Sequence, residues 1–100
     1  MFIHVVCFWL KPNTPAAARD QLIADSKAYL GKIPEVRHLW VGQPMMTPRE
    51  VVDNSYDVCL TVVLDDTAGH DAYQVAAPHK EFIERNKPHW DRVKIIDHAG

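Results

Sequence analysis

Hydrophobic positions along this chain fall into four short apolar runs and two longer segments with helical periodicity. The short runs are rich in β-branched and aromatic residues, which predicts β-strands. They lie at residues 2–10, 36–42, 56–64 and 92–98. Most of them are bounded by Pro, Gly, Asn or Asp, the residues that interrupt strands.

The two longer segments predict helices. Residues 15–32 carry apolar side chains three and four positions apart, with Thr14 as a suitable N-cap and Pro15 at the first helical position. The second segment runs from about residue 68 to about residue 86, after the capping residues Asp65, Asp66 and Thr67. The order β-α-β-β-α-β predicts an α+β, ferredoxin-like fold, with a four-stranded antiparallel sheet and both helices on one face. We expect residues 1–100 to form one domain.

The first and third strands are apolar on both sides, which is unusual for a sheet covered on one face only. In the first strand one row contains Phe2, His4, Val6, Phe8 and Leu10, and the other contains Ile3, Val5, Cys7 and Trp9. Two helices can cover only one of these faces, and a large exposed apolar patch usually marks an interface. The pattern predicts a homodimer formed sheet against sheet. By itself it leaves open whether the row with His4 faces the helices or the partner, and we expect the row of Ile3, Val5, Cys7 and Trp9 to form the interface. The alternative is that this face binds a different protein.

Composition and charge narrow the function classes. The chain is 47% hydrophobic and 24% charged, with a net charge of −2 and a pI of about 6.3. It has neither the basic surface that nucleic acids require nor a polybasic segment for anionic membranes, so we expect neither partner. The apolar N-terminal run lacks the features of a signal peptide and is too short to span a bilayer. These features favour a cytoplasmic protein.

The sequence contains no motif for a metal or cofactor. None of the six histidines lies in a short metal-binding motif, and there is no glycine-rich phosphate loop. Asp65 and Asp66 suit helix capping better than weak cation binding. Cys7 and Cys59 lie in apolar runs and are expected to be free thiols in a reducing compartment. The sequence leaves open which face Cys59 occupies.

Three residues are candidates for chemistry. His4 lies inside an apolar strand, where an imidazole needs hydrogen-bond partners and serves either as a core residue or as a pocket-lining donor. Tyr73 and His79 flank the interruption at Ala77-Pro78. On an unbroken helix they would lie about 120° apart around the helix axis and roughly 9 Å apart along it. A break at Pro78 can redirect His79 towards Tyr73; the alternative is an exposed histidine in the first turn of a new helix.

Four segments together resemble the stress-responsive A/B-barrel family, also called Dabb domains. They are HVVCFWLK at 4–11, YDVCLTVVLDD at 56–66, DAYQVAAPHKEF at 71–82 and WDRVKIIDH at 90–98. The resemblance covers essentially the whole chain in the same order. It implies a dimeric α/β barrel of two ferredoxin-like subunits, and a cavity in each subunit between the sheet and its own helices.

The resemblance also implies candidate functions. A few plant members are cofactor-independent polyketide cyclases that use a tyrosine and a histidine six residues later, within a D-Y-x-x-H-P-x-H pattern. Tyr73 and His79 match these two residues, and His4 matches a cavity histidine of the first strand. In this chain Ala76 replaces the middle histidine, and the proline falls one place later, at Pro78.

Three functions therefore stay open. The first is a stress-response-type protein that binds a small, partly apolar molecule through His4, Tyr73 and His79, without a cofactor. The second is a cyclase-like enzyme with Tyr73 and His79 as catalytic residues. The third, a monooxygenase-like dimeric α/β barrel, is implied by more distant similarity. For the loop at residues 43–55, Met45 and Met46 suit either the pocket mouth or the dimer seam.

Overall fold

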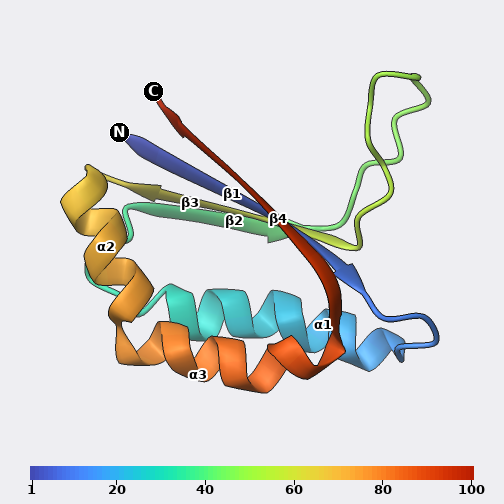
Figure 1. Ribbon diagram of the computed structural model, residues 1–100, viewed down its shortest axis with the longest axis horizontal. Coiled ribbons are helices and arrows are strands. Elements are labelled where there is room, and N and C mark those ends of the chain that lie inside the picture. The colour runs from blue at the N-terminus through green and yellow to red at the C-terminus, as the bar shows by residue number, and fades with distance from the viewer.

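One four-stranded antiparallel sheet forms a layer of the protein, and the three main helices cover one of its faces (Figure 1). The computed structural model describes residues 1–100. The strand order is β2-β3-β1-β4, so β1 and β3 are the central pair, as expected for the predicted ferredoxin-like topology. The strands are β1 (Phe2–Leu10), β2 (His38–Gly42), β3 (Val58–Leu64) and β4 (Trp90–Ala99).

The helices follow the predicted order, and the predicted ferredoxin-like fold is confirmed. The first is α1 (Ala16–Asp25), which continues as a π-helical segment, η1 (Ser26–Leu30). The second predicted helix is two helices, α2 (Thr67–Val75) and α3 (Ala77–Asn86). A short 3₁₀ turn, η2 (Lys87–His89), leads into β4. No helix is both long enough and apolar enough to cross a bilayer.

The two helix starts differ in how they are capped. The Oδ1 atom of Asp66 accepts a hydrogen bond from the backbone N–H of Gly69, so α2 has the side-chain cap that the sequence predicts. The prediction of Thr14 as the cap of α1 is wrong. Pro15 is the residue at the N-cap, and the Thr14 hydroxyl instead donates a hydrogen bond to the carbonyl of Lys11 at 2.6 Å. The hydroxyl stabilises the turn before the helix rather than the helix itself.

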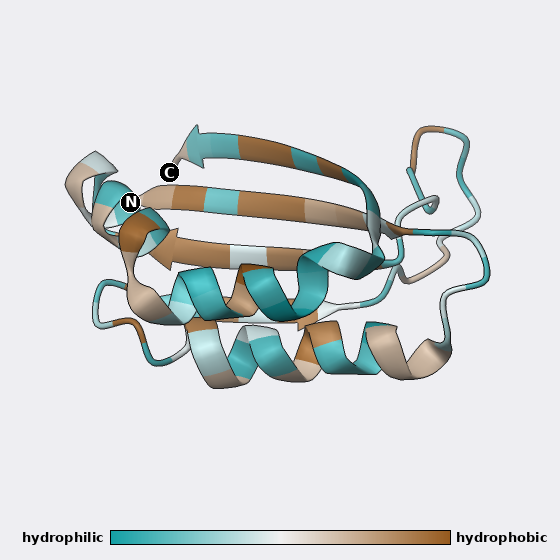
Figure 2. Ribbon diagram, turned by 60° about the horizontal axis from the view of Figure 1, so that its bottom comes forward, coloured by the Kyte–Doolittle hydropathy of each residue, from teal (hydrophilic) through white to brown (hydrophobic).

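The core lies between the sheet and the helices, and alternation along the strands decides which residues enter it. His4, Val6 and Phe8 of β1 are buried, whereas Ile3, Val5, Cys7 and Trp9 are half-buried on the opposite face. Figure 2 shows that β1 and β3 are hydrophobic along most of their length. The core also contains Leu22, Leu30, Ile33, Val58, Leu60, Val62, Leu64, Tyr73 and Phe82.

The sheet face opposite the helices is uncovered within one chain (Figure 1). Directly paired residues of neighbouring strands share a face. The pairing therefore places Trp40, Thr61, Val5 and Ile96 in one row across all four strands. Trp40 and Ile96 are 59% and 50% exposed. This face is an apolar surface at the expected place.

The strand pairing also shows which face of the sheet Cys59 occupies. Cys7 pairs directly with Cys59, and their sulfur atoms are 4.0 Å apart on the uncovered face. Both are free thiols.

Candidate functional site

A single residue, Ala76, separates α2 from α3 and sets the direction of His79. Its backbone is extended (φ −64°, ψ 143°), so α2 ends and α3 starts on a new axis. Pro78 lies in the first turn of α3, where a missing N–H leaves no helical hydrogen bond unmade. His79 is nevertheless buried, at 8% exposure. The structure therefore has a new helix at the proline, but its first-turn histidine points inwards.

His4, Tyr73 and His79 line one cavity between the sheet and the helices. The ring centroids of Tyr73 and His79 are 4.8 Å apart with an interplanar angle of 72°, and those of His4 and Tyr73 are 6.0 Å apart. The cavity has a volume of about 130 Å³, and nine of its twelve lining residues are hydrophobic. The structure thus brings the three residues singled out from the sequence into one mostly apolar space.

The cavity sets the protonation of its lining groups. Burial lowers the pKa of His79, and the neighbouring His4 and His70 lower it further. The ring is therefore a neutral imidazole at neutral pH. Burial raises the pKa of Tyr73 well above its ordinary value, so its phenol keeps its proton. A neutral imidazole and a protonated phenol in contact can act as a base and a hydrogen-bond donor.

Two ring nitrogens at this cavity are buried and have no hydrogen-bond partner in the protein. They are Nδ1 of His79 and Nε1 of Trp90, and both residues line the cavity. Buried polar atoms are almost always paired, so an unpaired one needs an explanation. A molecule with a polar atom, bound in the cavity, would supply one.

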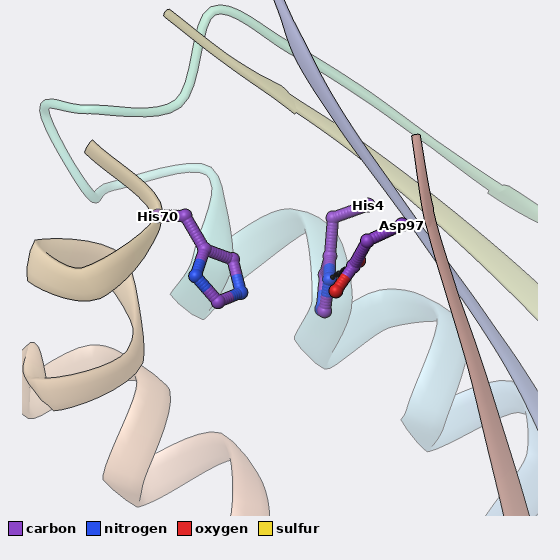
Figure 3. Close-up of side chains that lie close together, drawn as sticks. All are labelled: His4, His70 and Asp97. Atoms are coloured by element: carbon purple, nitrogen blue, oxygen red, sulfur yellow. Dashed lines mark hydrogen bonds and ion pairs between the residues drawn. The ribbon is translucent and has the colours of Figure 1, made fainter. Parts of the chain in front are cut away.

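A second group of polar residues lies beside the cavity. Nδ1 of His4 donates a hydrogen bond to Oδ1 of Asp97 at 2.6 Å (Figure 3). Burial lowers the pKa of His4, and the hydrogen bond to Asp97 opposes this shift without cancelling it. The ring of His70, from α2, is 5.2 Å from the His4 ring, centroid to centroid. His4 therefore belongs to both groups.

Sequence reasoning did not find Trp90, Asp97 or His70 as site residues. Trp90 and Asp97 lie on β4, and their positions depend on how β4 pairs with β1. His70 had a usable signal, because it precedes Tyr73 by three residues on one helix and so lies on a neighbouring part of the same face. The loop of residues 43–55 contributes nothing to the cavity. Met45 and Met46 are 89% and 63% exposed, so they do not plug it within their own chain.

The chain resembles one family of proteins over nearly its whole length. The family model described as Stress responsive A/B Barrel Domain matches residues 2–99. No curated protein matches the sequence.

Several solved structures share the fold. A Dabb family protein with a ferredoxin-like fold from Mesorhizobium loti is 23% identical, with a TM-score of 0.80 over 99% of this chain and 95% of that chain. A dimeric ferredoxin-like protein of unknown function from Thermobifida fusca is 19% identical, with a TM-score of 0.84 over 99% and 90%. Hydroxynitrile lyase from Passiflora edulis is 18% identical, with a TM-score of 0.82 over 97% and 90%. Identities this low establish the common fold alone.

Proposed function

Because the chain belongs to the stress-responsive A/B barrel domain family, we propose that it is a homodimer that binds a small, partly apolar molecule between sheet and helices. The observation that carries the binding proposal is the pair of unpartnered ring nitrogens, on His79 and Trp90, at one cavity. The indole N–H of Trp90 can only donate, so the ligand needs an acceptor such as a carbonyl oxygen. The remaining lining is mostly apolar, which suits a hydrocarbon body.

The volume of the cavity limits the size of the ligand. About 130 Å³ compares with roughly 150 Å³ for an engineered apolar cavity that binds benzene. Sites for drug-sized ligands occupy about 300–1,000 Å³. The cavity therefore suits one small ring with a polar atom, or the reacting end of a longer molecule. A group as large as haem does not fit without movement of the helices, which disfavours a haem-dependent monooxygenase.

Binding is tested with a panel of small cyclic ketones, with cyclohexanone as the first probe and methylcyclohexane as an apolar control of similar shape. We expect cyclohexanone to shift the NMR resonances of the Trp90 indole N–H and the His79 ring in a saturable way, and methylcyclohexane to bind more weakly. Trp90→Phe keeps the apolar ring but removes the N–H. It should weaken ketone binding by about tenfold, the value of roughly one good hydrogen bond, and leave methylcyclohexane unaffected. A panel in which no ketone shifts these resonances contradicts the proposal.

Dimerisation is proposed through the uncovered sheet face that carries Ile3, Val5, Cys7 and Trp9. Two observations support it: this face is mostly apolar along the central strands β1 and β3, with Trp40 and Ile96 continuing it onto β2 and β4, and proteins of the same fold are described as dimeric. A second copy of the chain presents the same apolar surface, as a twofold interface requires. The cytoplasm is the proposed location, because two free thiols 4.0 Å apart suit a reducing compartment.

A cofactor-independent enzyme is the second candidate, favoured by the contact between Tyr73 and His79. His79 would remove a proton from a carbon next to a carbonyl, and Tyr73 would donate a hydrogen bond to the enolate oxygen. In an aldol-type cyclisation the enolate carbon then bonds to a second carbonyl carbon of the same molecule, and that oxygen takes up a proton.

The enzyme candidate is tested without knowing the substrate. In D₂O, catalysed removal of an α-proton exchanges it for deuterium, which NMR detects on a small 1,3-diketone. Wild-type protein should accelerate the exchange, and His79→Ala should reduce the acceleration by about a hundredfold or more. Tyr73→Phe should lower the rate while His38→Ala, at an exposed histidine, leaves it unchanged. Equal rates for wild type and His79→Ala would exclude His79 as the base.

A further inference from the structure

Three potential metal ligands from three separate elements meet beside the cavity. His4 comes from β1, Asp97 from β4 and His70 from α2, and one ligand atom of each lies within 4.8 Å of the others. Figure 3 shows the His4 ring and the Asp97 carboxylate side by side, with the His70 ring facing them from α2. Because the three residues are 66 and 27 positions apart in sequence (70 − 4 and 97 − 70), no short motif reveals them.

The fold holds two of these side chains together before any ion binds. His4 and Asp97 are directly paired across β1 and β4, and their side chains are in hydrogen-bond contact at 2.6 Å. His4 is 3% exposed, so its position is set by the core. The ring of His70 is stacked on that of Phe2, with centroids 4.4 Å apart and an interplanar angle of 17°. Packing thus directs His70 towards the pair.

The third ligand needs a modest movement. Metal–ligand bonds of about 2.0–2.2 Å place ligand atoms roughly 3.0–3.5 Å from one another, whereas the present span reaches 4.8 Å. His70 must therefore approach by roughly 1.5 Å. Its present polar contacts do not prevent this, because they are long contacts within its own helix: 3.3 Å to Asp71 and 3.2 Å to Gln74. The side chain of Asp97 is 39% exposed, so an ion can reach its carboxylate from solvent.

We propose that His4, His70 and Asp97 bind one divalent transition-metal ion. Two imidazoles and one carboxylate are a donor set that suits Zn²⁺, Fe²⁺ or Co²⁺ rather than Ca²⁺ or Mg²⁺, which prefer oxygen ligands. Three protein ligands leave at least one coordination position open to water or to a small molecule. Asp97 also borders a surface depression of about 340 Å³, so the site is open to solvent on that side. The proposal does not depend on what the neighbouring cavity binds.

The site is tested with the untagged full chain, dialysed against EDTA and titrated with ZnCl₂ and CoCl₂. Calorimetry should give one ion per chain, and the visible absorption of Co²⁺ should report mixed nitrogen and oxygen ligands. His70→Ala and Asp97→Asn should each weaken binding by about tenfold or more. Both residues are partly exposed, so these variants are expected to fold. Zn²⁺ should raise the melting temperature of the wild type and not that of His70→Ala.

His98→Ala is the matched control, because His98 is an exposed histidine that borders the same depression as Asp97 but is not one of the three clustered residues. It should bind Zn²⁺ as wild type does. The proposal is overturned if wild type binds no ion under these conditions, or if His70→Ala and Asp97→Asn bind as tightly as wild type. Binding that disappears only in His98→Ala would show a surface histidine instead, and would overturn it as well.

Discussion

His79 gives the protein a pH-dependent stability. Its folded-state pKa is below the ordinary value of 6.5 because the ring is buried. As the pH falls below about 6.5, the unfolded chain takes up a proton that the folded chain does not, so the free energy of unfolding decreases. His4 is shifted in the same direction and adds to the effect. Above that pH neither ring is protonated in either state, and this contribution to the pH dependence is absent.

We therefore expect His79→Gln to flatten the pH dependence of stability between about pH 5 and pH 6.5. Urea unfolding of wild type and variant across this range measures the slope, and part of it should remain in the variant because His4 is still present. His38→Gln, at an exposed histidine, is the control and should keep the wild-type slope. Identical slopes for wild type and His79→Gln would contradict the assignment.

At the scale of single residues, the sequence predicted those site residues whose positions depend on one local segment of the chain. Tyr73 and His79 flank a proline in a helical pattern, and that break was visible in the sequence. Whether Asp97 lies opposite His4 depends on strand register, which a shift of two residues would change without altering the hydrophobic pattern. Trp90 was missed for a related reason, since β4 begins two residues earlier than its apolar run predicts.

Between elements, a buried polar cluster connects α1 to α3. Asp25 is 6% exposed and Asn86 is 1% exposed. The Asn86 amide donates to Asp25 at 3.0 Å and to the carbonyl of Phe82 at 2.9 Å, and Arg85 donates to Asp25 at 2.8 Å. A buried carboxylate is tolerated only when it is hydrogen-bonded, so each donor matters.

Asn86→Ala should destabilise the protein by about 1–3 kcal/mol, because it leaves the Asp25 carboxylate buried with one donor fewer. Chemical denaturation measures the change. Asp20→Ala removes an exposed ion pair with Arg19 on the same helix as Asp25 and should have little effect. A loss in Asn86→Ala no greater than in Asp20→Ala would show that water solvates Asp25 adequately without the amide.

The elements themselves were predicted well because their apolar patterns are long. The end of α1 was not, since its last turn is π-helical. There the hydroxyl of Ser26 donates to the carbonyl of Leu22 at 2.7 Å. Serine back-bonding of this kind bends helices, and hydrophobic spacing does not report it. The start of α1 was predicted one residue too early, at Pro15 instead of Ala16. Here too a hydroxyl bonds locally to a carbonyl, because Thr14 donates to Lys11 instead of capping the helix.

For the whole molecule, the uncovered sheet face makes the assembly state testable. Val5 lies at the centre of the row that runs from Trp40 to Ile96. Val5→Arg places a charge there and should convert the dimer to a monomer at micromolar concentration in analytical ultracentrifugation, since a buried unpaired charge costs several kcal/mol. Glu84→Arg, at an exposed position of α3, should leave the assembly unchanged.

A wild-type chain that is monomeric at micromolar concentration would contradict the homodimer and favour a different protein partner for this face. The prediction of an interface came from the number of apolar faces. Both rows of side chains on β1 are apolar, but the helices of one chain can cover only one face of the sheet. The same reasoning could not say which row of β1 faces the helices. It also could not say which residues of the other strands share that face, because this requires the pairing of all four strands.

The one-residue connection at Ala76 has a consequence for which sequence changes this chain can tolerate. An insertion or deletion there would change both the direction and the starting point of α3 relative to α2, which would carry His79 away from Tyr73. Substitutions are different, because Ala76 needs only an extended backbone and a proline at position 77 would still lie in the first turn of α3. We therefore expect the length of the segment between Tyr73 and His79 to be tightly constrained while the identities of most residues within it vary freely.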